Sequence, residues 1–360
     1  MPSMEQDRRR RRVVIGVDTH KHVHVSVALD AIGGVIGTRF FAADSGGYVQ
    51  LIEWAVSLGG GTLTFAIEGT GSYGAGLTSA VRRAGIGAVE VMRTDRRDRR
   101  LRGKSDTLDA ENAARAVLAG NATAIPKTND GTVEMIRQIK VAKDLAVKGR
   151  SAAIISLKTV IVNAEPELRE QLQSLPRMAL IERCAGLRPG PVNTVLAATK
   201  HTLRAIARRW QQLNTEVAEH EKILTRLTKQ LVPELVAAHG IGPDTAAEML
   251  IVAGDNADRV RSEPAWARLL GVAPVPASSG MTTRHRLNRG GHRQANSALY
   301  RSVIVRMQFH EPTKAYVARR TTEGKTKREI IRCLKRLLAR EIWTLMRPFR
   351  EASATTGTAT

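Results

Sequence analysis

Four acidic side chains lie at positions where a folded chain can bring them together. Asp18 and Glu68 each follow a short apolar segment with the pattern of a buried strand, and Asp106 and Asp109 open a helical segment. Residues three apart on a helix share a face, and the ends of elements are where folds gather functional side chains. Four converging carboxylates would hold two divalent cations, an arrangement that stabilises both oxygens in a phosphodiester displacement. Taken alone, the pair Asp106 and Asp109 would equally suit an ordinary helix N-terminus, so the prediction depends on the whole set of acids.

A dense basic segment precedes the second pair of acids, and the whole chain is strongly basic. Its 360 residues include 56 Lys and Arg against 34 Asp and Glu, a formal charge of +22. Such an excess favours a polyanionic partner, and a nucleic-acid backbone is the polyanion that would be held against a metal site. The nucleic-acid-binding candidates beside the acids are Arg96, Arg97, Arg99, Arg100, Arg102 and Lys104.

The C-terminal part carries a second set of candidates. Gly240 and Gly242 form a tight turn that feeds a helix. This turn would expose N–H groups to a DNA phosphate, as helix-hairpin-helix modules do, or would simply join two helices. Ser278 and Ser279 precede a glycine in a basic setting where a serine could attack phosphate, although most loop serines only form turns. The basic residues that follow are Arg284, Arg286, Arg289 and Arg293.

Two further patterns each have two interpretations. His20, His22 and His24 alternate, which could present three imidazoles as a transition-metal site, or could place a histidine-rich hairpin near phosphate. An amphipathic helix near the C-terminus carries Lys335 and Arg336 among its basic residues. The basic residues of that helix would form either a surface that binds phosphate or a face exposed to solvent.

The elements that would position the first set of acids have the pattern of a mixed sheet. Three strand segments come first and predict an antiparallel meander, and helices then alternate with strands. We therefore expect an α/β domain at 13–125, with helices on both faces of its sheet, preceded by a basic arm at 1–12. The expected strands are 13–17, 23–29, 35–41, 62–67 and 88–92, and the expected helices are 47–57, 76–84 and 107–118.

Strand signals fade after Pro126, and the rest of the chain is predicted to be helical. One long helix or two cover 133–163, and another covers about 192–231. The apolar stripe of the latter, which passes through Trp210, steps by three or four residues and suits either a coiled-coil arm or a helix packed on its own domain. The expected organisation is a helical connection at 126–234, a helical C-terminal domain at 235–349 and a disordered tail at 350–360.

The cysteines and apolar runs indicate the compartment. Cys184 and Cys333 are too few for a disulfide framework, and the longest apolar runs fall well short of the ~18 residues that a membrane-spanning helix needs. We therefore expect a reduced, cytoplasmic protein without a membrane anchor.

Several blocks of residues together resemble the DEDD transposases of the IS one-ten insertion-sequence family. The resemblance spans about 13–346. It implies a ribonuclease H-like (RuvC-like) N-terminal domain, a coiled-coil connection and a helical C-terminal transposase domain. The blocks are Ile15-Gly16-Val17-Asp18, Ile67-Glu68-Gly69-Thr70-Gly71-Ser72-Tyr73-Gly74, Gly103-Lys104-Ser105-Asp106-Thr107-Leu108-Asp109-Ala110-Glu111, Gly240-Ile241-Gly242 and Ser278-Ser279-Gly280.

The same resemblance implies a mechanism and partners. The four acids would bind Mg²⁺, and Ser279, or Ser278 in its place, would attack DNA and form a transient phosphoserine link before strand exchange. A structured RNA encoded by the element would pair with donor and target DNA. The chain would act as a homo-oligomer, a dimer or a tetramer, at the bacterial nucleoid. Metal site and serine would come from different protomers, and the helix around Trp210 is a candidate interface.

Two other functions fit parts of the pattern. The acids without the serine would suit a junction-resolving nuclease in which metal-activated water attacks the phosphodiester. The strong positive charge, taken without the acidic cluster, would suit a non-catalytic protein that binds RNA or DNA.

Overall fold

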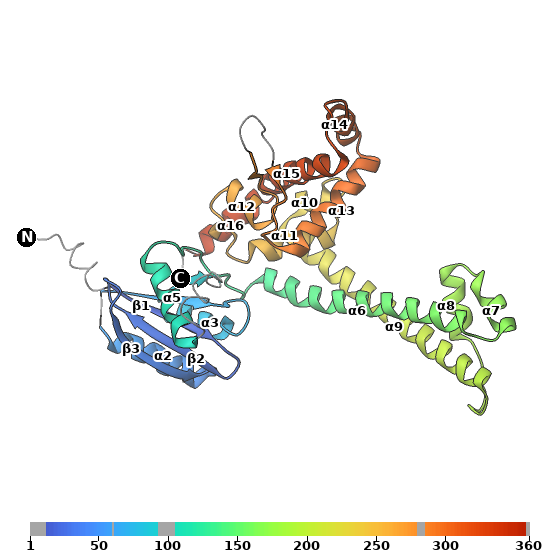
Figure 1. The fold of residues 1–360 in the computed structure, drawn as a ribbon, viewed down its shortest axis with the longest axis horizontal. Coiled ribbons are helices and arrows are strands. Elements are labelled where there is room, and N and C mark those ends of the chain that lie inside the picture. Colours follow the sequence, from blue (N-terminus) through green and yellow to red (C-terminus); the bar gives the residue numbers. More distant parts are fainter. Residues whose placement is uncertain (1–11, 60, 93–104, 279–284, 358–360) are drawn as a thin grey trace, which may run out of the picture. The chain divides into compact units, whose positions relative to one another are not determined.

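The computed structural model describes residues 12–59, 61–92, 105–278 and 285–357. The chain divides into two compact units, Met1–Thr128 and Asn129–Thr360, and each is described by itself (Figure 1).

The first unit is built on a five-stranded mixed sheet. Its strand order is β3-β2-β1-β4-β5, in which the first three strands are antiparallel and β4 and β5 run parallel to β1. The predicted meander followed by alternating helices and strands is confirmed. The strands are β1 (Arg12–Thr19), β2 (Val23–Leu29), β3 (Val35–Ala42), β4 (Thr62–Glu68) and β5 (Gly87–Val91).

Helices cover both faces of this sheet, as the sequence predicts. One face packs against α2 (Ser45–Ser57) and α3 (Ala75–Arg83), and the other packs against α5 (Asp106–Leu118). Successive side chains of a strand point to opposite faces, and this alternation sorts the apolar residues into two cores. The core under α2 and α3 includes Ile15, Val17, Phe65, Ile67 and Leu77, and the core under α5 includes Val14, Val27, Ala66, Ala110 and Ala114.

Gly16 lets α5 lie directly on the central strand. A Cβ atom at Gly16 would be 1.9 Å from the carbonyl oxygen of Ala110 and 2.8 Å from the amide nitrogen of Ala114. Both atoms belong to the α5 backbone, so a side chain at this position could not be accommodated by rotating a neighbouring side chain. The glycine therefore sets how closely α5 approaches β1.

The second unit begins with a pair of long helices, α6 (Thr132–Val162) and α9 (Val195–Leu231), which pack along one another. The predicted segment 133–163 is thus one helix. Two short helices, α7 (Pro166–Gln173) and α8 (Arg177–Ala185), connect the pair. The apolar stripe of α9 is covered by its own chain, because Trp210 is buried in a core with Leu157 of α6 and Ile181 of α8. The stripe around Trp210 is therefore an internal packing surface and not an exposed interface, which corrects that expectation.

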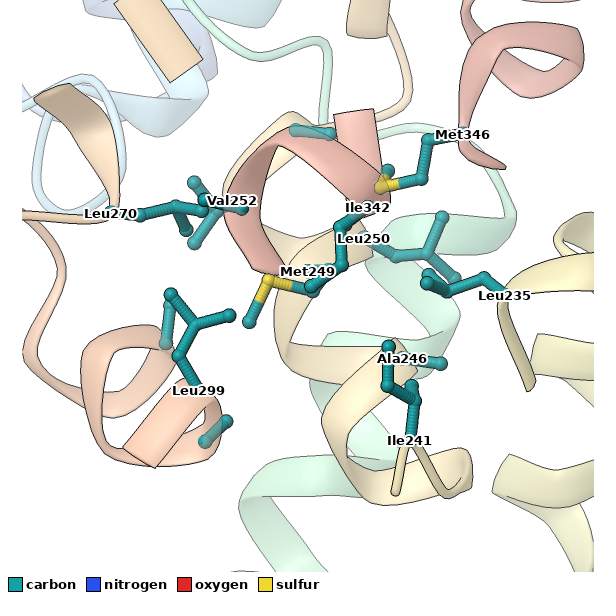
Figure 2. Close-up of a cluster of buried hydrophobic side chains, with 14 of the residues drawn as sticks. Leu235, Ile241, Ala246, Met249, Leu250, Val252, Leu270, Leu299, Ile342 and Met346 are labelled. Carbon is teal, nitrogen blue, oxygen red and sulfur yellow. The ribbon is translucent and has the colours of Figure 1, made fainter. Parts of the chain in front are cut away.

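The remaining helices form a bundle around one apolar core. Figure 2 shows part of this core, where Met249 and Leu250 of α11 meet Leu299 of α13 and Ile342 of α15. The core also takes in one end of α6 and of α9, including Ile136 and Leu224. The elements are α10 (Pro233–Ala237), α11 (Pro243–Ala253), η1 (Ala257–Arg259), α12 (Glu263–Leu269), β6 (Val275–Pro276), β7 (His285–Arg286), α13 (Arg293–Phe309), α14 (Glu311–Thr322), α15 (Lys327–Leu345) and α16 (Arg347–Gly357).

The end of the chain departs from the sequence prediction. A disordered tail is expected at 350–360, but α16 continues through Gly357. Residues 358–360 lie outside the described part. The helix packs on η1, and Arg350 stacks its guanidinium 3.4 Å from the ring centre of Trp343, so a tertiary contact supports a segment of weak intrinsic helix preference.

Among the helices of the described ranges, none combines the length and hydropathy needed to span a membrane.

Candidate metal centre and serine loop

The parallel pairing of β1 and β4 brings two of the predicted acids to one sheet edge. Val17 pairs with Ile67, so Asp18 and Glu68 are the next residues along two adjacent strands that run in the same direction. The Thr19 hydroxyl donates a hydrogen bond of 2.8 Å to the carbonyl oxygen of Glu68, which joins the two strand ends.

Side-chain alternation decides which face these acids occupy. Val17 and Ile67 pack in the core under α2 and α3, whereas Ala66 packs in the core under α5. Asp18 and Glu68 each follow a residue that faces α2 and α3, so both lie on the face covered by α5. This is also the face where the second pair of acids stands.

The first turn of α5 supplies that second pair. Asp106 is the first residue of the helix, and Asp109, three residues later, is buried at 6% exposure. Acids in a first helical turn interact favourably with the helix dipole, which suits this end of α5 to carboxylates. The charges of Asp109 and Asp106 both act on Asp18, so three of the four predicted acids interact around this strand end.

His20 belongs to the same cluster. Its Nε2 atom lies 3.2 Å from Oδ2 of Asp18 and 3.4 Å from Oδ2 of Asp106. One potential ligand atom from each of these three residues lies within 4.8 Å of the others. The sequence signal for this contact is the spacing Asp18-x-His20 at a strand end.

The electrostatics of Asp18 fit a site for a divalent cation. Burial raises the pKa of Asp18, the nearby His20 lowers it, and the charges of Asp109 and Asp106 raise it further, with a net shift above the ordinary value. Oxygen-rich sites of this kind suit Mg²⁺ or Mn²⁺, and a bound cation would compensate the crowded carboxylates. The residues present therefore fit the metal that the sequence implies.

The three alternating histidines do not form a common site. His20 joins the acids, and His22 is exposed. His24 is fully buried, stacked on Tyr48 with ring centres 5.7 Å apart, and its burial lowers its pKa. The interpretation of His20, His22 and His24 as a joint transition-metal site is therefore wrong.

The serine loop belongs to the second unit and is fixed at its base. Ser278 is exposed and follows β6, while Ser279 and Gly280 lie outside the described residues. Gly271 and Gly291 flank the loop in the left-handed region, at φ 66° and φ 86°, and a Cβ at Gly291 would be 2.4 Å from the Gly271 amide nitrogen. Only glycines allow this close backbone approach.

A half-buried amide reinforces the base of the loop. Asn296 of α13 donates hydrogen bonds of 2.8 Å to the Leu270 carbonyl and 3.2 Å to the Gly271 carbonyl. Lys335 of α15 in turn donates to the Asn296 Oδ1 atom at 2.8 Å. These contacts hold the start of the loop on the bundle, so that the loop extends from a rigid support.

The predicted nucleic-acid contacts are placed in part. Arg286, Arg289 and Arg293 are exposed on and after β7. Gly242 is exposed at the N-terminus of α11, whereas Gly240, at φ 73°, packs on the side chain of Arg306. The other candidates lie outside the described residues, namely Arg96, Arg97, Arg99, Arg100, Arg102, Lys104 and Arg284.

Two basic residues of α15 are committed to internal contacts. Lys335 is buried beneath Asn296, and Arg336 forms an ion pair with Glu263 of α12. Lys327 and Arg328 at the start of the helix are exposed. A phosphate-binding surface on α15 can therefore include its first turn. Lys335 and Arg336 instead make contacts within the protein that stabilise its fold.

A charged cavity of about 450 Å³ lies among α6, α9, α11 and α13. Lys140, with 7% of its side chain exposed, lies 2.6 Å from Asp144 and 3.2 Å from the buried Glu248. Lys143 pairs with Glu221 and, at 3.1 Å, with Asp244. Positive and negative groups are balanced here, so these side chains join α6 to α11 and α9 rather than forming an anion site.

Comparisons with known proteins match both parts of the chain to transposase families. Residues 15–166 match a family model of DEDD transposases of the IS110 type, described as Transposase, and residues 233–318 match the model described as Transposase IS116/IS110/IS902 family. The Insertion element IS900 uncharacterized 42 kDa protein of Mycobacterium paratuberculosis is 26% identical over 155 residues, 42% of this chain and 38% of that protein.

A second relative has the same kind of description. The Insertion element IS110 uncharacterized 43.6 kDa protein of Streptomyces coelicolor is 31% identical over 121 residues, 32% of this chain and 29% of that protein. The matches thus span less than two fifths of the length of either relative.

Proposed function

The chain belongs to the IS110 family of transposases, and on that premise we propose that it cleaves and exchanges DNA strands for an insertion sequence at a divalent-metal site. The observation that carries this proposal is the convergence of Asp18 and Asp106 at the end of β1. Glu68 and Asp109 complete the set on the same face of the sheet. We infer a ribonuclease H-like (RuvC-like) fold for the first unit, which the strand order β3-β2-β1-β4-β5 supports.

The four acids would hold two Mg²⁺ ions. Bound ions of this kind polarise the phosphodiester and stabilise the attacking and leaving oxygens. The protein's own contribution is to fix the carboxylates. The β1–β4 pairing places Asp18 beside Glu68, and the close seat of α5 on Gly16 places Asp106 and Asp109 opposite them.

The nucleophile in this proposal is Ser279, with Ser278 as the alternative. The serine Oγ gives up its proton and forms a bond to phosphorus while the bond from phosphorus to a deoxyribose oxygen breaks, and the leaving oxygen takes up a proton, so no net proton is consumed. One DNA end is then held as a phosphoserine ester until strand exchange releases the serine. The fixed base of the loop at Gly271 and Asn296 supports this role, because a nucleophile on a rigid support keeps its geometry.

The partners in the proposal are donor and target DNA and a structured RNA encoded by the element. The charge of +22 and the exposed arginines Arg286, Arg289 and Arg293 support contacts to nucleic-acid backbones. If about 6 to 10 phosphates are contacted, affinity should fall by roughly 10³ to 10⁵ between about 50 and 200 mM salt. A flat response to salt would contradict this part of the proposal. The turn at Gly240 and Gly242 is proposed as a further backbone contact, of the helix-hairpin-helix type.

We propose that the chain assembles as a homo-oligomer, a dimer or a tetramer, in which metal site and serine come from different protomers. The exposed side of α6 offers an apolar seam, because Val141, Leu145, Ile155 and Val162 are 56–71% exposed and recur with heptad spacing. Light scattering should show a smaller assembly for Ile155→Glu, whereas the neighbouring Ser156→Glu, off the seam, should assemble as wild type does.

A covalent-adduct assay tests the chemistry. The full chain is incubated with Mg²⁺, RNA from the flank of the element and labelled junction DNA, and the products are separated on a denaturing gel. We expect a slowly migrating protein–DNA adduct that is lost in Ser279→Ala and in Asp106→Asn. If Ser279→Ala retains the adduct and Ser278→Ala loses it, the nucleophile is Ser278.

Other outcomes distinguish the two alternative functions. DNA cut without an adduct, and cut equally by the double serine variant, would favour a nuclease that uses metal-activated water. If Asp106→Asn retains every activity that the wild type has, together with salt-sensitive binding, the chain is a non-catalytic nucleic-acid-binding protein.

A further inference from the structure

His20 lies between two acids that come from different elements. It stands in the turn after β1, where Asp18 lies at the strand end, and it faces Asp106 at the start of α5. Its Nε2 atom is 3.2 Å from one carboxylate and 3.4 Å from the other, and a set of ligand atoms from the three residues fits within 4.8 Å. A single ion at this point could touch all three side chains.

The Nε2 atom is shielded from solvent and lies close to both carboxylates, but it makes no well-aligned hydrogen bond with either. A buried polar atom left without a partner is costly, so such an atom at a functional site calls for an explanation. The lone pair of a neutral imidazole is a common metal ligand, and an ion held by the two carboxylates would satisfy it.

We propose that His20 is a direct ligand, through Nε2, of one of the divalent ions held by Asp18 and Asp106. This inference rests on the proposed metal site and adds a nitrogen to a set of oxygen ligands. Imidazole binds first-row transition metals better than it binds Mg²⁺, which prefers oxygen. His20 therefore shifts the preference of the site from Mg²⁺ toward an ion such as Mn²⁺.

The neighbouring histidines make a matched comparison possible. His22 is exposed and His24 is buried against Tyr48, so neither is placed to reach the ion. Among the three, His20 alone has its Nε2 beside carboxylates. Removing the His22 imidazole changes the same turn by the same number of atoms, so His22→Ala controls for the local effect of the substitution.

The test measures metal binding and not DNA cleavage. The full-length wild-type protein is titrated with Mn²⁺ and with Mg²⁺, and its Mn²⁺ complex is examined by pulsed electron paramagnetic resonance for coupling to ¹⁴N. We expect ¹⁴N coupling in wild type and in His22→Ala, and none in His20→Ala. Mn²⁺ affinity should fall at least about tenfold in His20→Ala, with a smaller change for Mg²⁺.

A second variant guards against a general loss of structure. His20→Asp supplies an oxygen ligand in place of the nitrogen, so it should bind Mg²⁺ at least as well as wild type does while losing the ¹⁴N signal. Equal Mn²⁺ affinity in His20→Ala and wild type would overturn the inference, as would ¹⁴N coupling that survives in His20→Ala. Tighter Mg²⁺ binding by His20→Ala would also overturn it, because His20 would then act as a competing cation.

The failure of the inference can be told apart from the failure of the proposed metal site. If wild type binds Mn²⁺, and Asp106→Asn does not, but no ¹⁴N coupling is seen, the acidic site stands and His20 is not a ligand. If wild type binds neither Mn²⁺ nor Mg²⁺, the proposed metal site itself is wrong, and the inference falls with it.

Discussion

Replacing Gly16 by alanine tests whether the seat of α5 on β1 sets the acidic cluster. The new Cβ would lie 1.9 Å from the carbonyl oxygen of Ala110, where ordinary contact begins near 3.4 Å. Because the opposing atoms are backbone, α5 must recede by about 1.5 Å to restore a normal contact. Asp109 is adjacent to Ala110, so a carboxylate of the cluster would move with the helix. Functional groups need to be held within about 0.5 Å of their productive positions, and this shift is larger.

The expected magnitudes follow from that displacement. Forcing a methyl group into a packed contact should lower the free energy of unfolding by about 1–3 kcal/mol. Affinity for Mn²⁺ should fall by at least about tenfold, the lower end of what disturbed ligand support costs. Urea denaturation followed by circular dichroism measures the first quantity, and Mn²⁺ titration of the folded variant measures the second.

Gly71 provides the control for this experiment. A Cβ at Gly71 would meet no atom within 4 Å, and the residue is exposed in the turn after Glu68. Gly71→Ala should therefore keep wild-type stability and wild-type Mn²⁺ affinity. The reasoning is refuted if Gly16→Ala behaves in the same way. A loss of stability with unchanged Mn²⁺ affinity would show that the acids are positioned independently of the α5 seat.

Three further predictions concern titratable groups of the second unit. Lys140→Met should lower the free energy of unfolding by about 3–5 kcal/mol in urea denaturation, because buried Glu248 loses its compensating charge. That loss should be smaller at pH 5 than at pH 8, since burial raises the pKa of Glu248 and lets the carboxyl take up a proton. Burial tends to raise the pKa of Asp244, but the nearby lysines hold it below its ordinary value. Its stabilising effect is therefore complete above about pH 4 and is lost as pH falls through the folded pKa, so the difference in stability between Asp244→Asn and wild type should shrink as pH falls from about 4 in acid unfolding. Burial raises the pKa of the Cys184 thiol to about 11, so mass spectrometry should find iodoacetamide on the half-buried Cys333 first.

The sheet and the four acids could be predicted because their signals are local. The apolar segment that ends at Asp18, and the one that ends at Glu68, have strand periodicity in a few consecutive residues. The pair Asp106 and Asp109 is fixed to one face by helix geometry alone. Once the order of strands places β1 beside β4, Asp18 and Glu68 become neighbours.

For the amphipathic helices, the sequence alone does not distinguish a face that packs inside the protein from a face that is exposed. The stripe through Trp210 has a spacing that fits a partner chain and a neighbouring helix equally well, and α6 and α8 prove to be its partners. Lys335 and Arg336 lie in a basic run, yet the structure turns them toward Asn296 and Glu263. The charge of a residue does not indicate whether its side chain will be covered by a segment far away in the sequence.

The sequence by itself determined the strands and helices around the sheet, the charge of the protein and the residue types of its acidic cluster. Only the tertiary structure decided that His20 joins Asp18 and Asp106, while His22 stays exposed and His24 is buried. Elements follow from interactions between residues a few positions apart, which are readable along the chain. The surroundings of a side chain depend on segments far apart in sequence, and here the packing of α5 on β1 supplies the carboxylate that faces His20.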